Sequence, residues 1–203
     1  MLSKSSIFAS LVAGAVALSA CSTGEPEDDP IDRRLCTAEE VGIDFIELAR
    51  GEFTPRDLAD LSDDGDGRER VYEAAGMERG RFVYYKQALP RPPFEPPVDI
   101  VCQVIEFESP DQAADYADGL DEVYPAVQVA GIAWLPEDRH TVEDVEPGIQ
   151  RVTIDGVGRT VSVLVGFAAH DRYFTSVYVG SEGEPPTIET LRRLQAGAAG
   201  NTD

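Results

Sequence analysis

The chain has 203 residues, of which 42% are hydrophobic, and a formal net charge of −21 at pH 7. This hydrophobic content is sufficient for a packed core and excludes the disordered class. The acidic balance repels phosphate backbones, so we expect no nucleic-acid partner, and it repels anionic lipid headgroups too.

The N-terminus has the order of an export signal. Lys4 is followed by an apolar run over 7–20 that serines interrupt. The run is shorter than the ~20 residues that span a bilayer, which favours a cleaved signal over a permanent transmembrane helix. It ends in Leu18-Ser19-Ala20-Cys21, which resembles the lipobox of bacterial lipoproteins.

That resemblance implies a diacylglycerol on Cys21, often with a further acyl chain such as palmitate. Two or more acyl chains anchor a protein stably. We therefore expect a lipoprotein on the extracytoplasmic side of the cell membrane, with the lipid on Cys21 as its membrane contact. The alternative is an ordinary secretory signal cut after Ala20.

Three segments are predicted: a signal peptide over 1–20, a flexible tether over 21–35 and a single domain over 36–199. The polar, proline-containing composition of 22–35 is typical of a linker. If Cys21 carries lipid, Cys36 and Cys102 remain, and an oxidising compartment favours a disulfide between them. Closing a loop of about 65 residues stabilises by roughly 4 kcal/mol. Two separate buried thiols are the alternative.

Helices are expected first in the domain. Thr37 and Glu40 have the form of a capping box. An apolar stripe of Val41, Phe45 and Leu48 then predicts a helix that stops at Gly51. Thr54 and the proline after it predict a second short helix with a buried leucine at 58 and at 61, and 68–75 predicts a third that ends before Gly76.

Strands are predicted over 81–86 and 98–108, with the second in a central position because both of its faces are apolar. Ser109 caps a helix that Pro125 ends, and 127–134 contains a further short strand. Three strands over 149–154, 160–169 and 173–179 follow, joined by hairpin turns. A last helix from Ile188 turns Leu191 and Leu194 inward.

This order predicts an α+β fold, with an antiparallel sheet of about five to six strands and helices packed mainly on one face. It is loosely similar to small actinobacterial lipoproteins and to the Mog1/PsbP-like sandwiches that some of them adopt.

One segment fits a calcium loop in part. From Ser62 to Glu73, the residues Asp64, Asp66, Gly67 and Glu73 take positions 3, 5, 6 and 12 of the EF-hand pattern. Position 1 is serine instead of aspartate, and a glutamate stands where a buried aliphatic residue belongs. An ordinary solvated turn is the alternative.

Other candidates are less specific. His140 and His170 lie in charged, loop-like surroundings, which favours surface positions over a general base. Seven aromatic residues could line a ligand cleft or pack under helices: Phe82, Tyr84, Tyr85, Phe94, Tyr173, Phe174 and Tyr178. The CxxC and Cys/His spacings of zinc sites are missing, so we expect no metal and no cofactor.

The sequence thus favours a lipid-anchored, non-catalytic domain that binds a ligand or a protein partner of the cell envelope. The alternatives are an envelope hydrolase whose site is assembled from separate strands, and a weak calcium-binding module.

Overall fold

The computed structural model describes residues 29–60, 65–88, 98–123, 140–156, 159–182 and 186–200. The elements are η1 (Asp32–Arg34), α2 (Ala38–Val41), β1 (Phe45–Phe53), α3 (Pro55–Ala59), α4 (Gly65–Ala74), β2 (Met77–Gln87), β3 (Val98–Phe107), α5 (Pro110–Val123), β4 (His140–Glu146), β5 (Ile149–Gly156), β6 (Arg159–His170), β7 (Tyr173–Glu182) and α6 (Ile188–Gly200).

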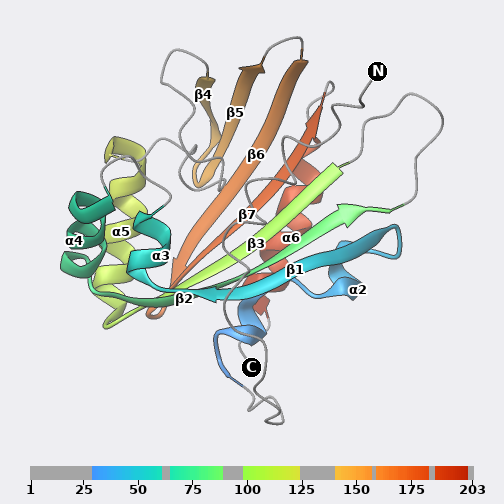
Figure 1. Cartoon of the computed structure of the whole chain (residues 1–203). Helices are drawn as coiled ribbons and strands as arrows, with labels where there is room; N and C mark the ends of the chain where they lie inside the picture. Colours follow the sequence, from blue (N-terminus) through green and yellow to red (C-terminus); the bar gives the residue numbers. More distant parts are fainter. Residues whose placement is uncertain are drawn as a thin grey trace.

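The strands form one seven-stranded sheet in the order β1-β2-β3-β7-β6-β5-β4, in which every neighbouring pair is antiparallel (Figure 1). The chain builds β1 to β3, passes through α5 to the far edge, and returns as a meander that ends beside β3. The predicted α+β class and antiparallel pairing are confirmed, but the predicted number of strands is too low because both edge strands, β1 and β4, were missed.

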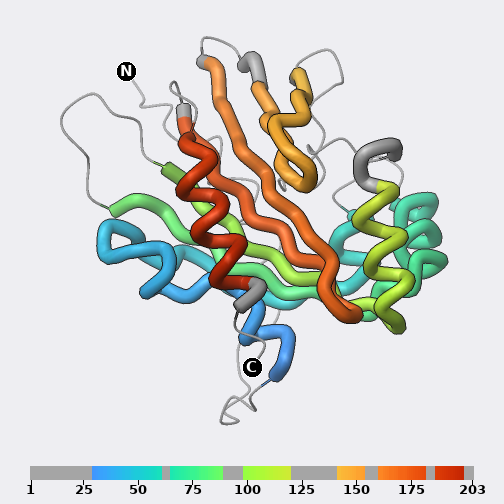
Figure 2. Tube along the Cα trace, turned by 180° about the vertical axis from the view of Figure 1, so that it is seen from behind, coloured from blue at the N-terminus to red at the C-terminus, as the bar shows by residue number. Residues whose placement is uncertain are grey.

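Helices cover both faces of the sheet, whereas the prediction placed them mainly on one face. Leu191 and Leu194 of α6 pack with Cys102 and Val104 of β3, and we call this side the α6 face. Ala113 of α5 packs with Ile105, whose side chain points the opposite way because neighbouring strand residues alternate. We call that side the α5 face; it also carries α3 and α4. Figure 2 shows α6 lying against the sheet.

The central position predicted for 98–108 is confirmed. β3 lies between β2 and β7, with apolar side chains buried on both faces. Ile100 and Val104 contribute to the core under α6, and Phe107 to the core under α5. A strand that is covered on both sides carries apolar residues on both of its faces, and this pattern predicted the central position.

The first predicted helix is much shorter than expected. Thr37 and Glu40 do form the capping box, in which each side chain bonds the other residue's backbone N–H. The helix nevertheless ends at Val41, because Gly42 takes a φ of 111° that breaks the helical path. The residues from Phe45 onward pair with β2 as a strand.

The other helices lie where the sequence placed them. Thr54 caps α3 with Asp57, and Pro55 lies in its first turn. Ser109 accepts a hydrogen bond from the backbone N–H of Gln112 at the start of α5. Leu191 and Leu194 of α6 are buried as predicted. The strand predicted over 127–134, Leu61 and the proline-rich loop over 90–97 lie outside the described residues.

Candidate functional site

The disulfide between Cys36 and Cys102 is present in the structure, with 5.8 Å between the two Cα atoms. Both cysteines are buried in the core under α6. The hydroxyl of Tyr85 donates a hydrogen bond to the carbonyl oxygen of Cys36 at 3.1 Å, which fixes the backbone at the crosslink. The segment that follows the predicted lipid attachment point is therefore tied covalently to the central strand.

Residues 29–35, which the sequence assigned to the tether, belong to the packed domain. Ile31 has no exposed surface, and Leu35 is buried beside it in the core under α6. Asp29 lies at the start of this segment and bonds to β2. The guanidinium of Arg79 donates to both oxygens of Asp29, at 2.8 and 3.1 Å. A bidentate pair of this kind holds the segment in one orientation.

Glu106 of β3 lies beneath that pair and has only 2% of its surface exposed. Its carboxylate accepts a hydrogen bond from Arg79 Nε at 2.6 Å, another from Arg172, and one from the hydroxyl of Tyr173 at 3.3 Å. A buried carboxylate is stable only when it is paired and hydrogen-bonded in this way. Arg79 thus bridges Glu106 in the sheet to Asp29 in the N-terminal segment.

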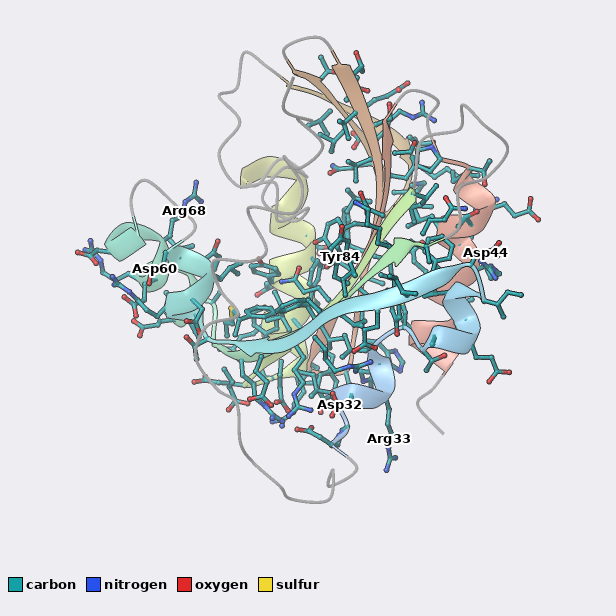
Figure 3. All side chains as sticks on the ribbon, turned by 45° about the vertical axis from the view of Figure 1, so that its right-hand side comes forward. Asp32, Arg33, Asp44, Asp60, Arg68 and Tyr84 are labelled. Carbon is teal, nitrogen blue, oxygen red and sulfur yellow. A yellow bond between two sulfur atoms is a disulfide. The ribbon has the colours of Figure 1, made fainter. Side chains whose placement is uncertain are left out.

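Two further arginines complete this arrangement. Arg81 forms ion pairs with Asp29 and Asp32. Arg34, which is almost fully buried, donates to Asp171 at 3.2 Å and stacks 4.4 Å above the ring of Tyr173. We name the set Asp29, Asp32, Arg34, Arg79, Arg81, Glu106 and Asp171 the N-terminal clasp. Figure 3 shows Asp32 on the inner side of the η1 segment, with Arg33 pointing away from the body of the domain.

The clasp makes the carboxyl group of Asp29 more acidic than that of an ordinary aspartate. Burial by itself raises the pKa of a carboxyl group, but the hydrogen bonds from Arg79 and the backbone N–H of Ile31, with the charges of Arg79 and Arg81, outweigh it. The pKa of Asp29 is therefore lowered from its ordinary value of 3.8. A lowered pKa stabilises the fold above the ordinary value, and this contribution is lost as the pH falls through the folded-state pKa.

We expect Asp29→Asn to lower the free energy of unfolding by about 1–2 kcal/mol at pH 7, because charge-assisted hydrogen bonds to Arg79 are lost. The deficit should shrink as the pH falls from about 3.8 through the lower pKa of the folded state, because the carboxyl group of the unfolded chain takes up its proton first and that of the folded protein follows. Urea unfolding at pH 7 and at pH 3 measures both values. A deficit that stays constant with pH would exclude the carboxylate charge as the cause.

The described aromatic residues proposed as a cleft lining divide between the two faces of the sheet, with Phe82, Tyr84, Phe174 and Tyr178 on the α5 face. Tyr85 and Tyr173 belong to the core under α6, whereas Phe174 belongs to the core under α5. Tyr84 also lies on the α5 face, where its hydroxyl donates to Asp99 at 2.8 Å. Figure 3 shows Tyr84 pointing between the sheet and α5. Phe174 packs against Tyr116 of α5, whereas Tyr178 packs among strand residues, and Phe94 lies outside the described residues.

A polar row lies in the middle of the α5 face. Tyr178 donates to Gln103 at 3.2 Å or to Ser176 at 2.9 Å, and Lys86 lies 3.7 Å from the carboxylate of Asp99. Burial raises the pKa of Tyr84, and the charge of Asp99 raises it further. Burial likewise raises the pKa of Tyr178. Both phenols are thus held neutral, so they act as hydrogen-bond donors and not as bases.

The calcium loop is not formed as the sequence suggested. Asp66, Gly67 and Glu73 all lie within the continuous helix α4, so Gly67 makes no sharp turn, and the loop conformation that the EF-hand pattern needs is missing there. Asp66 also bonds Arg56 at 2.9 Å. Ser62 and Asp64 lie outside the described residues. In the ranges that the structure describes, no three His, Cys, Asp or Glu side chains form a metal-binding group.

The two histidines lie at opposite ends of the sheet. His140 opens β4 opposite Ile154, which itself pairs with Val161, and His170 lies nine residues further along β6. At 3.3 Å per residue, about 30 Å separates them. The His170 side chain is 55% exposed, with its ring 3.8 Å from Asp171. Within the described chain no serine hydroxyl bonds this ring, so a serine–histidine pair is not formed at His170.

The clasp was missed at the sequence level because its members are distant in the chain. One signal was available in the sequence of β2. Arg79 and Arg81 lie at every second position in line with Val83 and Tyr85, so all four side chains lie on the same face of the strand. Positively charged residues on the same strand face as core residues indicate buried carboxylate partners.

In the described segments, no helix is both long and apolar enough to cross a membrane.

Comparison with known proteins yields a structural neighbour and no family. No family model matches the chain, and no curated protein matches it. Among solved structures, it is similar to the crystal structure of the extracellular domain of PknH from Mycobacterium tuberculosis, with a TM-score of 0.52 and 11% identity. The match covers 89% of this chain and 98% of that chain. At this identity the likeness shows a shared fold.

Proposed function

We propose that this protein is a lipid-anchored, extracytoplasmic and non-catalytic domain that binds a ligand or a protein partner at the cell envelope. The anchor is diacylglycerol on Cys21, at the end of the lipobox-like segment Leu18-Ser19-Ala20-Cys21. The clasp is the observation that carries the proposal. The clasp binds the chain to the domain at Asp29, eight residues after Cys21, through Arg79 of β2. The disulfide between Cys36 and Cys102 then joins the same segment covalently to β3.

This arrangement suits a domain that is held by its N-terminus. Eight residues span at most about 28 Å, so the anchor keeps the domain close to the bilayer. The net charge of −21 repels anionic headgroups, which makes the acyl chains the attachment. A buried disulfide is typical of an oxidising, extracytoplasmic compartment. The fold shared with an extracellular domain supports the same location.

We expect Cys21→Ser to move the protein from the membrane pellet to the soluble fraction, because no acyl chain can then be attached. Cell fractionation followed by mass spectrometry of the N-terminal peptide measures this. Thr23→Ser is the matched control, since it makes an equally small change two residues away, leaves Cys21 in place and should keep the protein in the pellet. An unmodified Cys21 in wild-type protein would refute the anchor.

The binding role has its own test. Crosslinking in intact cells followed by purification should recover a specific envelope component with the wild-type protein. Excess purified domain should compete with that capture, because a specific surface saturates. Capture that excess domain does not reduce would indicate non-specific adhesion and count against the binding role, while leaving the anchor unaffected.

A further inference from the structure

The two edges of the sheet differ in how they are protected. β4, at one edge, carries Glu143, Asp144 and Glu146, and charged residues of this kind discourage pairing with another strand. β1, at the other edge, also carries charges but exposes more aliphatic surface: Ile46 is 49% and Leu48 50% exposed, and Ile43 in the preceding turn is fully exposed, against 37% for Val142 on β4. We call Ile43, Ile46 and Leu48 the β1 patch. Figure 1 shows β1 as the outermost strand on its side.

Within the residues that the structure describes, the backbone of β1 is paired on one side only. Its residues from Phe45 to Phe53 bond to β2, and the sheet order ends at β1. The outward N–H and C=O groups of such a strand are a template for a further strand. Figure 3 labels Asp44 at the start of β1, far from Asp60 and Arg68 on the helices at its other end, so the patch lies in the half of the strand away from those helices.

The charges on β1 are arranged symmetrically. Glu47 and Arg50 form an ion pair along the strand, at 3.0 and 3.1 Å. A bulge at Leu48 brings both side chains to the α6 face, where Glu47 lies opposite Tyr85 and Arg50 opposite Val83. Glu47 and Arg50 therefore lie equally far from a point between Leu48 and Ala49.

We propose that a second copy of this chain pairs with the β1 edge, antiparallel and about a two-fold axis between Leu48 and Ala49. This register places Glu47 of each copy opposite Arg50 of the other, so the four charges alternate. It also places Leu48 opposite Ala49 and buries part of the β1 patch. A slip by one residue places Glu47 opposite Ala49 or Gly51, so that the charges of one copy no longer face opposite charges of the other copy.

The pairing is self-complementary, as a two-fold interface requires. The strongly negative net charge of each copy opposes it, so the contact is weak and responds to concentration and salt. Charge complementarity at the edge selects the second copy over an acidic partner strand. The acids of β4 exclude the same pairing at the opposite edge.

Sedimentation equilibrium of the full mature chain in density-matched detergent tests this. Wild-type protein should show a monomer–dimer equilibrium. Glu47→Arg or Arg50→Glu alone should raise the dimer Kd about tenfold or more, because like charges then face each other. The double variant Glu47→Arg with Arg50→Glu should restore the wild-type Kd, since the charges alternate again. Glu143→Arg on β4 is the matched control: it changes the net charge of the chain as Glu47→Arg does, yet it should not raise the Kd.

Each other outcome overturns the proposal. Wild-type protein that stays monomeric up to the highest concentration removes the interface. A double variant that does not recover the wild-type Kd excludes the register, and a Kd that Glu143→Arg raises places the contact on the other edge. Urea unfolding of every variant shows whether the monomer is intact, so a loss of folding is distinguished from a loss of pairing.

Discussion

Replacing both Cys36 and Cys102 by alanine is expected to lower the free energy of unfolding by about 4 kcal/mol. The disulfide closes a loop with a sequence separation of 66. In the chain-entropy model, such a crosslink lowers the entropy of the unfolded chain and so stabilises the folded state by about 4 kcal/mol. Both positions are buried, so the small cavity left by each sulfur adds to the loss. Because a single domain is stable by about 5–15 kcal/mol, the variant should be close to unfolding at 37 °C.

Urea unfolding of oxidised wild type, reduced wild type and the double alanine variant measures this effect. Reduced wild type and the variant should have similar midpoints, because both have an unrestricted loop. Cys21→Ser is the control, since Cys21 precedes the described domain, and it should leave the midpoint unchanged. A loss below about 1 kcal/mol would mean that the unfolded chain is already compact around residues 36 and 102.

Replacing Glu106 by alanine is expected to cost about 3 kcal/mol. The carboxylate is buried and accepts hydrogen bonds from Arg79, Arg172 and Tyr173. Removing it takes away a carboxylate that Arg79 and Arg172 share, takes the acceptor from the hydroxyl of Tyr173, and leaves a cavity in the sheet. Glu106→Gln should cost less, because the amide oxygen still accepts from the tyrosine hydroxyl.

Glu78→Gln is the matched control for Glu106. Glu78 also pairs with Arg172, at 3.7 Å, but its side chain is exposed. An exposed pair contributes little, so this change should shift stability by less than about 0.5 kcal/mol. Urea unfolding of the variants at pH 7 gives the comparison. Equal losses for Glu78→Gln and Glu106→Gln would show that burial of the carboxylate does not matter here.

Local signals predicted those elements whose stability depends on neighbours in the chain. The cap at Ser109 and the helix after it are present, as are the inward leucines of α6. The apolar residues on both faces of the strand predicted over 98–108 correctly indicated a central strand. In each case, the hydrogen bonds or the periodicity that define the element lie within about a dozen residues.

The same kind of signal failed at the edges of the sheet. The apolar residues from Val41 to Leu48 fit a helical stripe, yet the left-handed φ of Gly42 and pairing with β2 make the segment from Phe45 a strand. β4 was missed because its acidic sequence carries little strand propensity of its own, and its pairing with β5 supplies the structure. Edge strands depend on a partner that a sequence window does not contain.

The sequence by itself determined the acidity of the chain, its α+β class, the positions of the main helices and the two cysteines available for a disulfide. These properties follow from composition, from capping and from short-range periodicity. Only the tertiary structure decided that Asp29 meets Arg79, that Glu106 is buried beneath them, and that β1 is left as an open edge. Contacts across 50 residues or more of chain depend on how the strands are ordered, and that order is set by packing of the whole domain.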